Sequence, residues 1–98
     1  MLNITFEMDA LKCPPCGGEY LHHQKVTTYA RHEDAEHVLM TTAHKYTATT
    51  EHVENDTSGN PSSRRDGIVV TFECELCGVP SALAIAQHKG STLVYWVK

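Results

Sequence analysis

The 98-residue chain contains no apolar run that approaches the roughly 18 residues needed for a membrane-spanning helix. Its first residues also lack the basic segment and the following apolar segment of a secretory signal peptide. We therefore expect a cytoplasmic protein with no membrane partner. In a reducing cytoplasm, paired cysteines hold metal more often than they form disulfides.

Positive charge is also scarce, since 8 Lys and Arg face 12 Asp and Glu, for a formal net charge of −4 at pH 7. Proteins that bind nucleic acid without sequence preference use Lys and Arg to neutralise phosphates. The charge balance therefore disfavours a general nucleic-acid binder. The 7 histidines make the net charge sensitive to pH between about 5 and 7.

Patterns that carry catalysis are missing as well. The chain shows no Ser, His and Asp arrangement, no glycine-rich phosphate loop and no carboxylate pair in a setting that suggests a pocket. A domain of this length also has little room for a substrate cleft. We therefore expect a protein that is not an enzyme.

The 4 cysteines all fall in two Cys-x-x-Cys-Gly pairs, at residues 13–17 and 74–78. Two intervening residues let both sulfurs of a tight turn face one ion, and the glycine can take the positive φ that such a turn often needs. Two pairs with no cysteine left over predict one tetrahedral site for Zn²⁺. The predicted ligands are Cys13, Cys16, Cys74 and Cys77.

Four thiolates leave no open coordination position, so we expect a structural zinc ion and not a catalytic one. Binding of a structural zinc is worth roughly 10–16 kcal/mol at neutral pH, against a net stability of about 5–15 kcal/mol for an ordinary domain. Loss of the metal should then cost the fold. Another metal such as iron, and thiol redox chemistry at residues 13–16, stay open as alternatives.

Much of the chain alternates apolar and polar residues or is rich in residues that favour strands. This pattern predicts strands over residues 2–8, 19–29 and 68–76, and a hairpin in which residues 81–87 and 91–97 flank a turn at 88–90. The single domain, residues 1–98, is expected to be all-β, with an antiparallel sheet.

The segment between the cysteine pairs is harder to assign. Apolar residues in 37–53 fall at helical spacing, but five threonines between Thr41 and Thr50 disfavour a helix because branching at Cβ restricts χ1. We predict a long strand there, with a helix as the alternative. Residues 54–67 are polar and rich in turn residues, which predicts a flexible loop.

The two Cys-x-x-Cys-Gly knuckles, each beside a predicted strand, resemble those of the zinc-ribbon family, whose small members occur in bacterial and phage genomes. The resemblance covers about half of the chain, namely the first knuckle with its neighbours and residues 68–97. It implies that the four cysteines are the ligands and that strands from the second knuckle form the sheet of the ribbon.

The chain departs from simple ribbons in the distance between its knuckles. It has 57 residues between Cys16 and Cys74, where simple ribbons have roughly 15–20. The longer loop costs only about 1 kcal/mol of closure entropy by the logarithmic rule. We therefore expect a ribbon sheet extended by an inserted pair of strands, with the insertion at about residues 30–67.

The resemblance implies a role by analogy, since ribbons commonly serve as appendages of nucleic-acid machines. We predict a protein–protein interaction module, acting as an accessory factor or inhibitor of a nucleic-acid-processing complex of a phage or mobile element. The alternative is direct, weak nucleic-acid binding, to which Lys25 would contribute. Exposed strand edges would also allow a dimer. The candidate partner-binding residues are Arg64, Arg65, Lys89 and Trp96.

Two further groups have a functional and an ordinary interpretation. His32 and His37 form the one patch that suggests a second metal site, but we favour solvent-facing or partly buried histidines with ordinary roles. Tyr95 and Trp96 are neighbours on a predicted strand, so they face opposite sides of the sheet. We expect one of these rings in the core and the other exposed.

Overall fold

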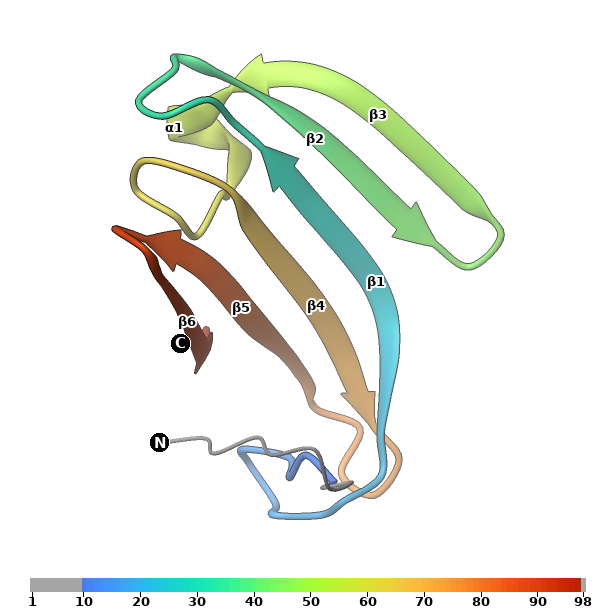
Figure 1. Cartoon of the computed structure of the whole chain (residues 1–98). Coiled ribbons are helices and arrows are strands. Elements are labelled where there is room, and N and C mark those ends of the chain that lie inside the picture. The colour runs from blue at the N-terminus through green and yellow to red at the C-terminus, as the bar shows by residue number, and fades with distance from the viewer. Residues whose placement is uncertain (1–9, 98) are drawn as a thin grey trace.

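The computed structural model describes residues 10–97 as a six-stranded antiparallel open sheet with almost no helix (Figure 1). The strands lie in the order β3-β2-β1-β4-β5-β6, so both edges of the sheet are hairpin strands. The predicted strand at residues 2–8 lies outside the described residues. The elements are β1 (Leu21–Ala30), β2 (His37–His44), β3 (Thr47–Glu54), α1 (Asn55–Ser58), β4 (Gly67–Cys74), β5 (Pro80–His88) and β6 (Ser91–Trp96).

The all-β prediction is confirmed, and three of the predicted segments match the observed strands. β1, β4 and the β5–β6 hairpin occupy the segments where apolar and polar residues alternate. Lys89 and Gly90 form the turn of that hairpin with φ of 54° and 107°. Positive φ at both central residues is typical of the tight turns that match the twist of antiparallel strands.

Residues 37–53 form strand, and β2 and β3 are the pair of strands expected in the insertion, but the prediction of one long strand is wrong. The chain reverses at Lys45 and Tyr46, and β2 pairs with β3 along its whole length, from His37 opposite Glu54 to His44 opposite Thr47. Lys45 has a positive φ of 57°. Glycine or asparagine usually marks such a turn, and neither is present here, so no residue at the turn itself indicates the reversal.

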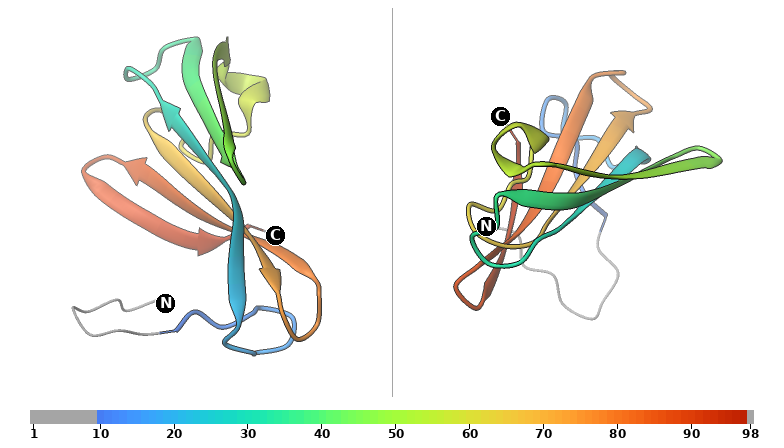
Figure 2. Two further views of the ribbon diagram at one scale, coloured as in Figure 1. Left: turned by 90° about the vertical axis from the view of Figure 1, so that its right-hand side faces the viewer. Right: turned by 90° about the horizontal axis from the view of Figure 1, so that it is seen from above.

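β1 is bent by a bulge between His23 and Lys25, where its register with β4 shifts. A bulge bends a strand and increases its twist. The part of β1 before the bulge pairs only with β4, and the part after it pairs with both β2 and β4. The β2–β3 hairpin therefore diverges from the lower half of the sheet, as Figures 1 and 2 show.

The core of this open sheet is small. The radius of gyration of the molecule is 14.3 Å, compared with about 13 Å for a compact domain of 100 residues. On one face, Tyr29 is buried and its hydroxyl donates to the carbonyl of Ser58 at 3.1 Å. On the opposite face, the rings of Phe72 and Trp96 pack edge to face with centroids 5.9 Å apart. The buried apolar side chains of the strands are Tyr29, Val38, Phe72, Leu83, Ala84 and Ala86.

The segment after β3 covers the Tyr29 face and makes specific contacts. The amide of Asn60 donates to the side-chain oxygen of Asn55 at 2.9 Å and to the carbonyl of Arg65 at 3.0 Å. The Ser62 hydroxyl is buried and donates to the carbonyl of Gln87 at 2.7 Å. Asn60 therefore connects two parts of the predicted loop, and Ser62 attaches the loop to β5. Among residues 10–97, no helix is long and apolar enough to cross a membrane, because α1 has only four residues.

Candidate metal centre

The antiparallel pairing of β1 with β4 brings the two knuckles together. The first knuckle precedes β1 and the second follows β4, and the register places Leu21 opposite Cys74. The backbone N–H of Glu75 donates to the carbonyl of Tyr20 at 2.9 Å and extends this pairing past the strand ends. Two segments far apart in the sequence thus meet at one end of the sheet, the lower end in Figure 1.

The four cysteine sulfurs form one compact cluster. All of them lie within 4.8 Å of one another. The Sγ atoms of Cys13 and Cys77 are 3.6 Å apart, and so are those of Cys16 and Cys74. Each close pair therefore joins one knuckle to the other. A cluster of four sulfurs at these distances can hold one metal ion, as the sequence predicted.

The two knuckles have the same backbone geometry. The N–H of Gly17 donates to the carbonyl of Cys13 at 2.7 Å, and the N–H of Gly78 donates to that of Cys74 at 2.9 Å. Both glycines have positive φ, 76° for Gly17 and 70° for Gly78. This conformation is strained for residues with a Cβ atom, which explains a glycine after the second cysteine of each pair.

The sulfurs differ in their surroundings. Backbone N–H groups of Cys77 and Leu76 lower the pKa of the Cys74 thiol to about 6, because they donate to the thiolate. Burial raises the pKa of the Cys13 thiol to about 12. Cys13 and Cys74 are buried, whereas Cys16 and Cys77 are exposed. The cluster thus has an inner pair of sulfurs towards the protein and an outer pair towards solvent.

Exposed apolar side chains surround this end of the molecule. Tyr20 is 60% exposed, Leu76 is 64% exposed and Val79 is 41% exposed. A Cβ atom placed on Gly18 would lie 2.6 Å from Cδ1 of Leu76, so the two knuckles touch here. We call Tyr20, Leu76 and Val79 the knuckle surface. Sequence reasoning missed it because Leu76 continues the alternation of the preceding strand, which in the structure ends at Cys74.

Three of the four candidate partner-binding residues gather around one pocket. Arg64, Arg65 and Lys89 line a cavity of about 360 Å³ together with Glu33. The arginines are already paired there, since Glu33 lies 3.1 Å from Arg64 and 3.2 Å from Arg65. Arg64 also donates two hydrogen bonds to Asp34, of 2.9 and 2.7 Å. This pairing lowers the pKa of Asp34 and offsets the positive charge of the pocket.

Trp96 does not line this pocket. It ends β6, whereas Lys89 lies just before the start of that strand, so the two residues are at opposite ends of β6. The ring of Trp96 is half-buried against Phe72. Tyr95 faces the other side of the sheet and is 43% exposed. The two rings therefore lie on opposite faces as expected, and the more exposed one is Tyr95 and not the predicted candidate.

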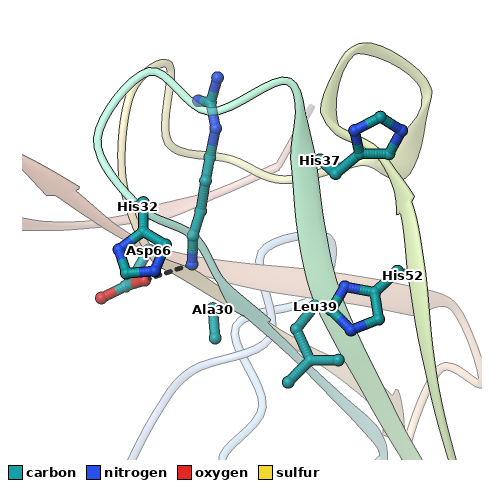
Figure 3. A pocket seen from close by; sticks show the side chains of 7 residues that line it. Ala30, His32, His37, Leu39, His52 and Asp66 are labelled. Carbon is teal, nitrogen blue, oxygen red and sulfur yellow. Dashed lines mark hydrogen bonds between the residues drawn. The ribbon is translucent and has the colours of Figure 1, made fainter.

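A pocket near the other end of the sheet is lined by three histidines (Figure 3). His32, His37 and His52 surround a cavity of about 540 Å³, and Asp66 accepts a hydrogen bond of 2.8 Å from the backbone N–H of Arg31 at its side. In residues 10–97, the cysteine cluster is the one group of His, Cys, Asp or Glu close enough to hold an ion. The suggested patch of His32 and His37 is therefore not assembled as a metal site in this structure.

The resemblance to zinc ribbons rests on the residues themselves, because no family model, curated protein or solved structure matches the chain.

Proposed function

We propose that the cysteine cluster holds one structural Zn²⁺ and that the chain is a zinc ribbon with a long insertion. A tetrahedron with Zn–S bonds of about 2.3 Å has sulfur–sulfur edges of about 3.8 Å. The two inter-knuckle pairs at 3.6 Å, in a cluster no wider than 4.8 Å, fit that geometry. We base the proposal on this agreement between the sulfur–sulfur distances and a ZnS4 tetrahedron.

The chemistry of the donors supports the same ion. Soft thiolates select zinc, copper(I) or iron–sulfur clusters over hard cations. A single centre with four sulfurs and no further donor suits Zn²⁺ in a closed, structural site. Such a site leaves no position for a water or a substrate, which supports a role that is not enzymatic.

A bound ion would add stability that the small apolar core of this fold does not supply. An open sheet with few fully buried side chains has little apolar area to stabilise it, and small domains often use a metal in place of a large core. Zinc would connect residues 13–16 to residues 74–77. It would thus close the end of the sheet at which β1 begins and β4 ends. Its binding energy, roughly 10–16 kcal/mol, is enough to decide whether the chain folds.

We further propose that the metal end is an interaction surface for another protein. The knuckle surface places three exposed apolar side chains on a backbone that the ion would hold rigid, and exposed apolar groups in one place mark binding sites. The zinc-ribbon resemblance suggests a cytoplasmic accessory factor or inhibitor of a nucleic-acid-processing complex of a phage or mobile element as the setting.

Direct nucleic-acid binding has less support. The cavity that collects Arg64, Arg65 and Lys89 also holds Glu33, and Asp34 occupies the guanidinium fork of Arg64. A phosphate would have to displace these carboxylates in a chain that already carries a net charge of −4.

Two measurements test the proposal. Native mass spectrometry of the purified protein should give one zinc per chain, and a chelator should unfold it. A compact, metal-free protein would contradict the structural site. Fluorescence anisotropy with labelled single- and double-stranded DNA at low salt should give no binding. Binding that weakens steeply with added salt would instead favour the nucleic-acid alternative.

A further inference from the structure

The outer edge of β3 is free among the described residues, because β3 is the last strand of the sheet. All of its eight side chains are exposed except that of Val53. Natural edge strands are usually protected by charged side chains, lysine above all, or by proline, a bulge, short length or a covering segment. β3 has no proline, no lysine and no shift in its register with β2, and its acidic side chains are those of Glu51 and Glu54.

The turn before β3 determines which backbone groups point outward. His44 and Thr47 flank a two-residue turn and form the first pair of the hairpin, which exchanges both backbone hydrogen bonds. Hydrogen-bonded pairs recur at every second residue, so residues 47, 49, 51 and 53 bond to β2. The N–H and C=O groups of the other four point away from the sheet; these residues are Ala48, Thr50, His52 and Glu54.

We propose that this edge pairs with β3 of a second copy of the chain, antiparallel, about a two-fold axis that passes beside Thr50. The two sheets would then join into one continuous sheet through about six backbone hydrogen bonds. In this register Thr50 lies opposite its own counterpart, and Ala48 lies opposite the His52 of the other copy. All the bonding residues are ones whose backbone groups already point outward.

Two observations disfavour registers whose axis lies further toward the end of β3. An axis beside Glu51 would place two carboxylates directly opposite each other, which is unfavourable. An axis beside His52 would bring the start of α1, which follows Glu54, against the middle of β3 in the other copy. The axis beside Thr50 avoids both the facing carboxylates and the contact with α1. It places Glu54 of one copy opposite Tyr46 at the tip of the hairpin in the other copy.

The side chains of one face support the same axis. Thr28 lies opposite Thr41 and Thr41 lies opposite Thr50, with the last two hydroxyl oxygens 3.1 Å apart. The proposed dimer continues this row of threonines across the two-fold axis into the other copy. Threonine pairs directly across strands are among the favourable pairs of antiparallel sheets.

Sedimentation velocity of the metal-loaded protein over a range of concentrations tests the proposal. The wild type should pass from monomer to dimer as concentration rises. Thr50→Pro should stay monomeric, because it removes an outward N–H that makes no bond within the chain. Thr50→Val is the matched control, since it also loses the hydroxyl but keeps the N–H, and it should still dimerise. All three proteins should bind the same amount of zinc.

A cross-link tests the register independently. Directly opposite residues in a hydrogen-bonded pair have Cα atoms about 5.5 Å apart, within the range for a disulfide. Under glutathione disulfide, metal-loaded Thr50→Cys should give a covalent dimer. Thr47→Cys should not, because its counterpart lies about six residues away along the strand.

Three results would overturn the proposal: a wild type that is monomeric at every concentration, a dimer that Thr50→Pro leaves intact, or equal cross-linking of the two cysteine variants. None of them affects the zinc proposal, which is tested by metal content and by unfolding with a chelator.

Discussion

Leu21, the first residue of β1, lies directly opposite Cys74, the last residue of β4. This one pair in the register explains why two knuckles separated by 57 residues of sequence share a site. The long insertion leaves from the far end of β1 and returns at the start of β4, so its length does not disturb the cysteines. A sheet with this topology can accept strands in the insertion without moving the cysteine cluster.

The first prediction concerns the ligands. Replacing Cys74 by serine should abolish metal binding and unfold the domain, because the expected zinc energy, of order 10 kcal/mol, is as large as the net stability of an ordinary domain. Metal analysis and circular dichroism would measure both effects. Cys77→His is the control: an imidazole can complete a tetrahedral zinc site, so this variant should keep one zinc at lower affinity. Native melting of Cys74→Ser without metal would contradict a structural role.

The second prediction concerns the turn of the second knuckle. Gly78 has φ of 70° and nothing lies within 4 Å of the position of an added Cβ atom, so only backbone strain opposes a side chain there. Gly78→Ala should destabilise the protein by about 1–2 kcal/mol in urea unfolding. Gly78→Asn should lose less, because asparagine tolerates the left-handed conformation better. Equal losses for both variants would point to a cause other than φ.

Alternation was a sound guide wherever a strand has one half-buried face. It predicted β4 and the β5–β6 hairpin, whereas residue types that favour strands predicted β1, and the spacing of the cysteines predicted which sulfurs would meet. It could not show that residues 37–53 fold back on themselves. Alternation is the same in one long strand and in two short ones, and Lys45 takes a turn conformation that usually falls to glycine.

Long-range pairing of charges was also invisible in the sequence. Arg64 and Asp34 are 30 residues apart along the chain, and nothing in their local patterns relates them. They meet because the loops after β1 and before β4 lie at the same end of the sheet. The polar residues of 54–67 are turn formers by type, but their contacts with the sheet depend on the topology.

The third prediction follows from that ion pair. Hydrogen bonds and charge from Arg64 hold the pKa of Asp34 below its ordinary value. A carboxyl with a lower pKa when folded adds stability above its unfolded pKa of about 3.9, and this contribution is lost as pH falls through the folded value. In an NMR titration, Arg64→Ala should raise the pKa of Asp34 towards normal. Because both groups are largely exposed, the melting temperature at pH 7 should change little.

The last prediction separates binding from stability at the metal end. Leu76 is 64% exposed, so Leu76→Ser should change the free energy of unfolding by no more than about 0.5 kcal/mol. If the knuckle surface is the contact with a partner, this variant should lose the partner that wild-type protein retains, whereas zinc content stays at one per chain. Leu93→Ser is the matched control, since Leu93 is an exposed leucine on β6, outside the knuckle surface. Retention of the same partner by Leu76→Ser would contradict a contact at the knuckle surface. Its loss with Leu93→Ser alone would place the contact at the edge of the sheet at β6.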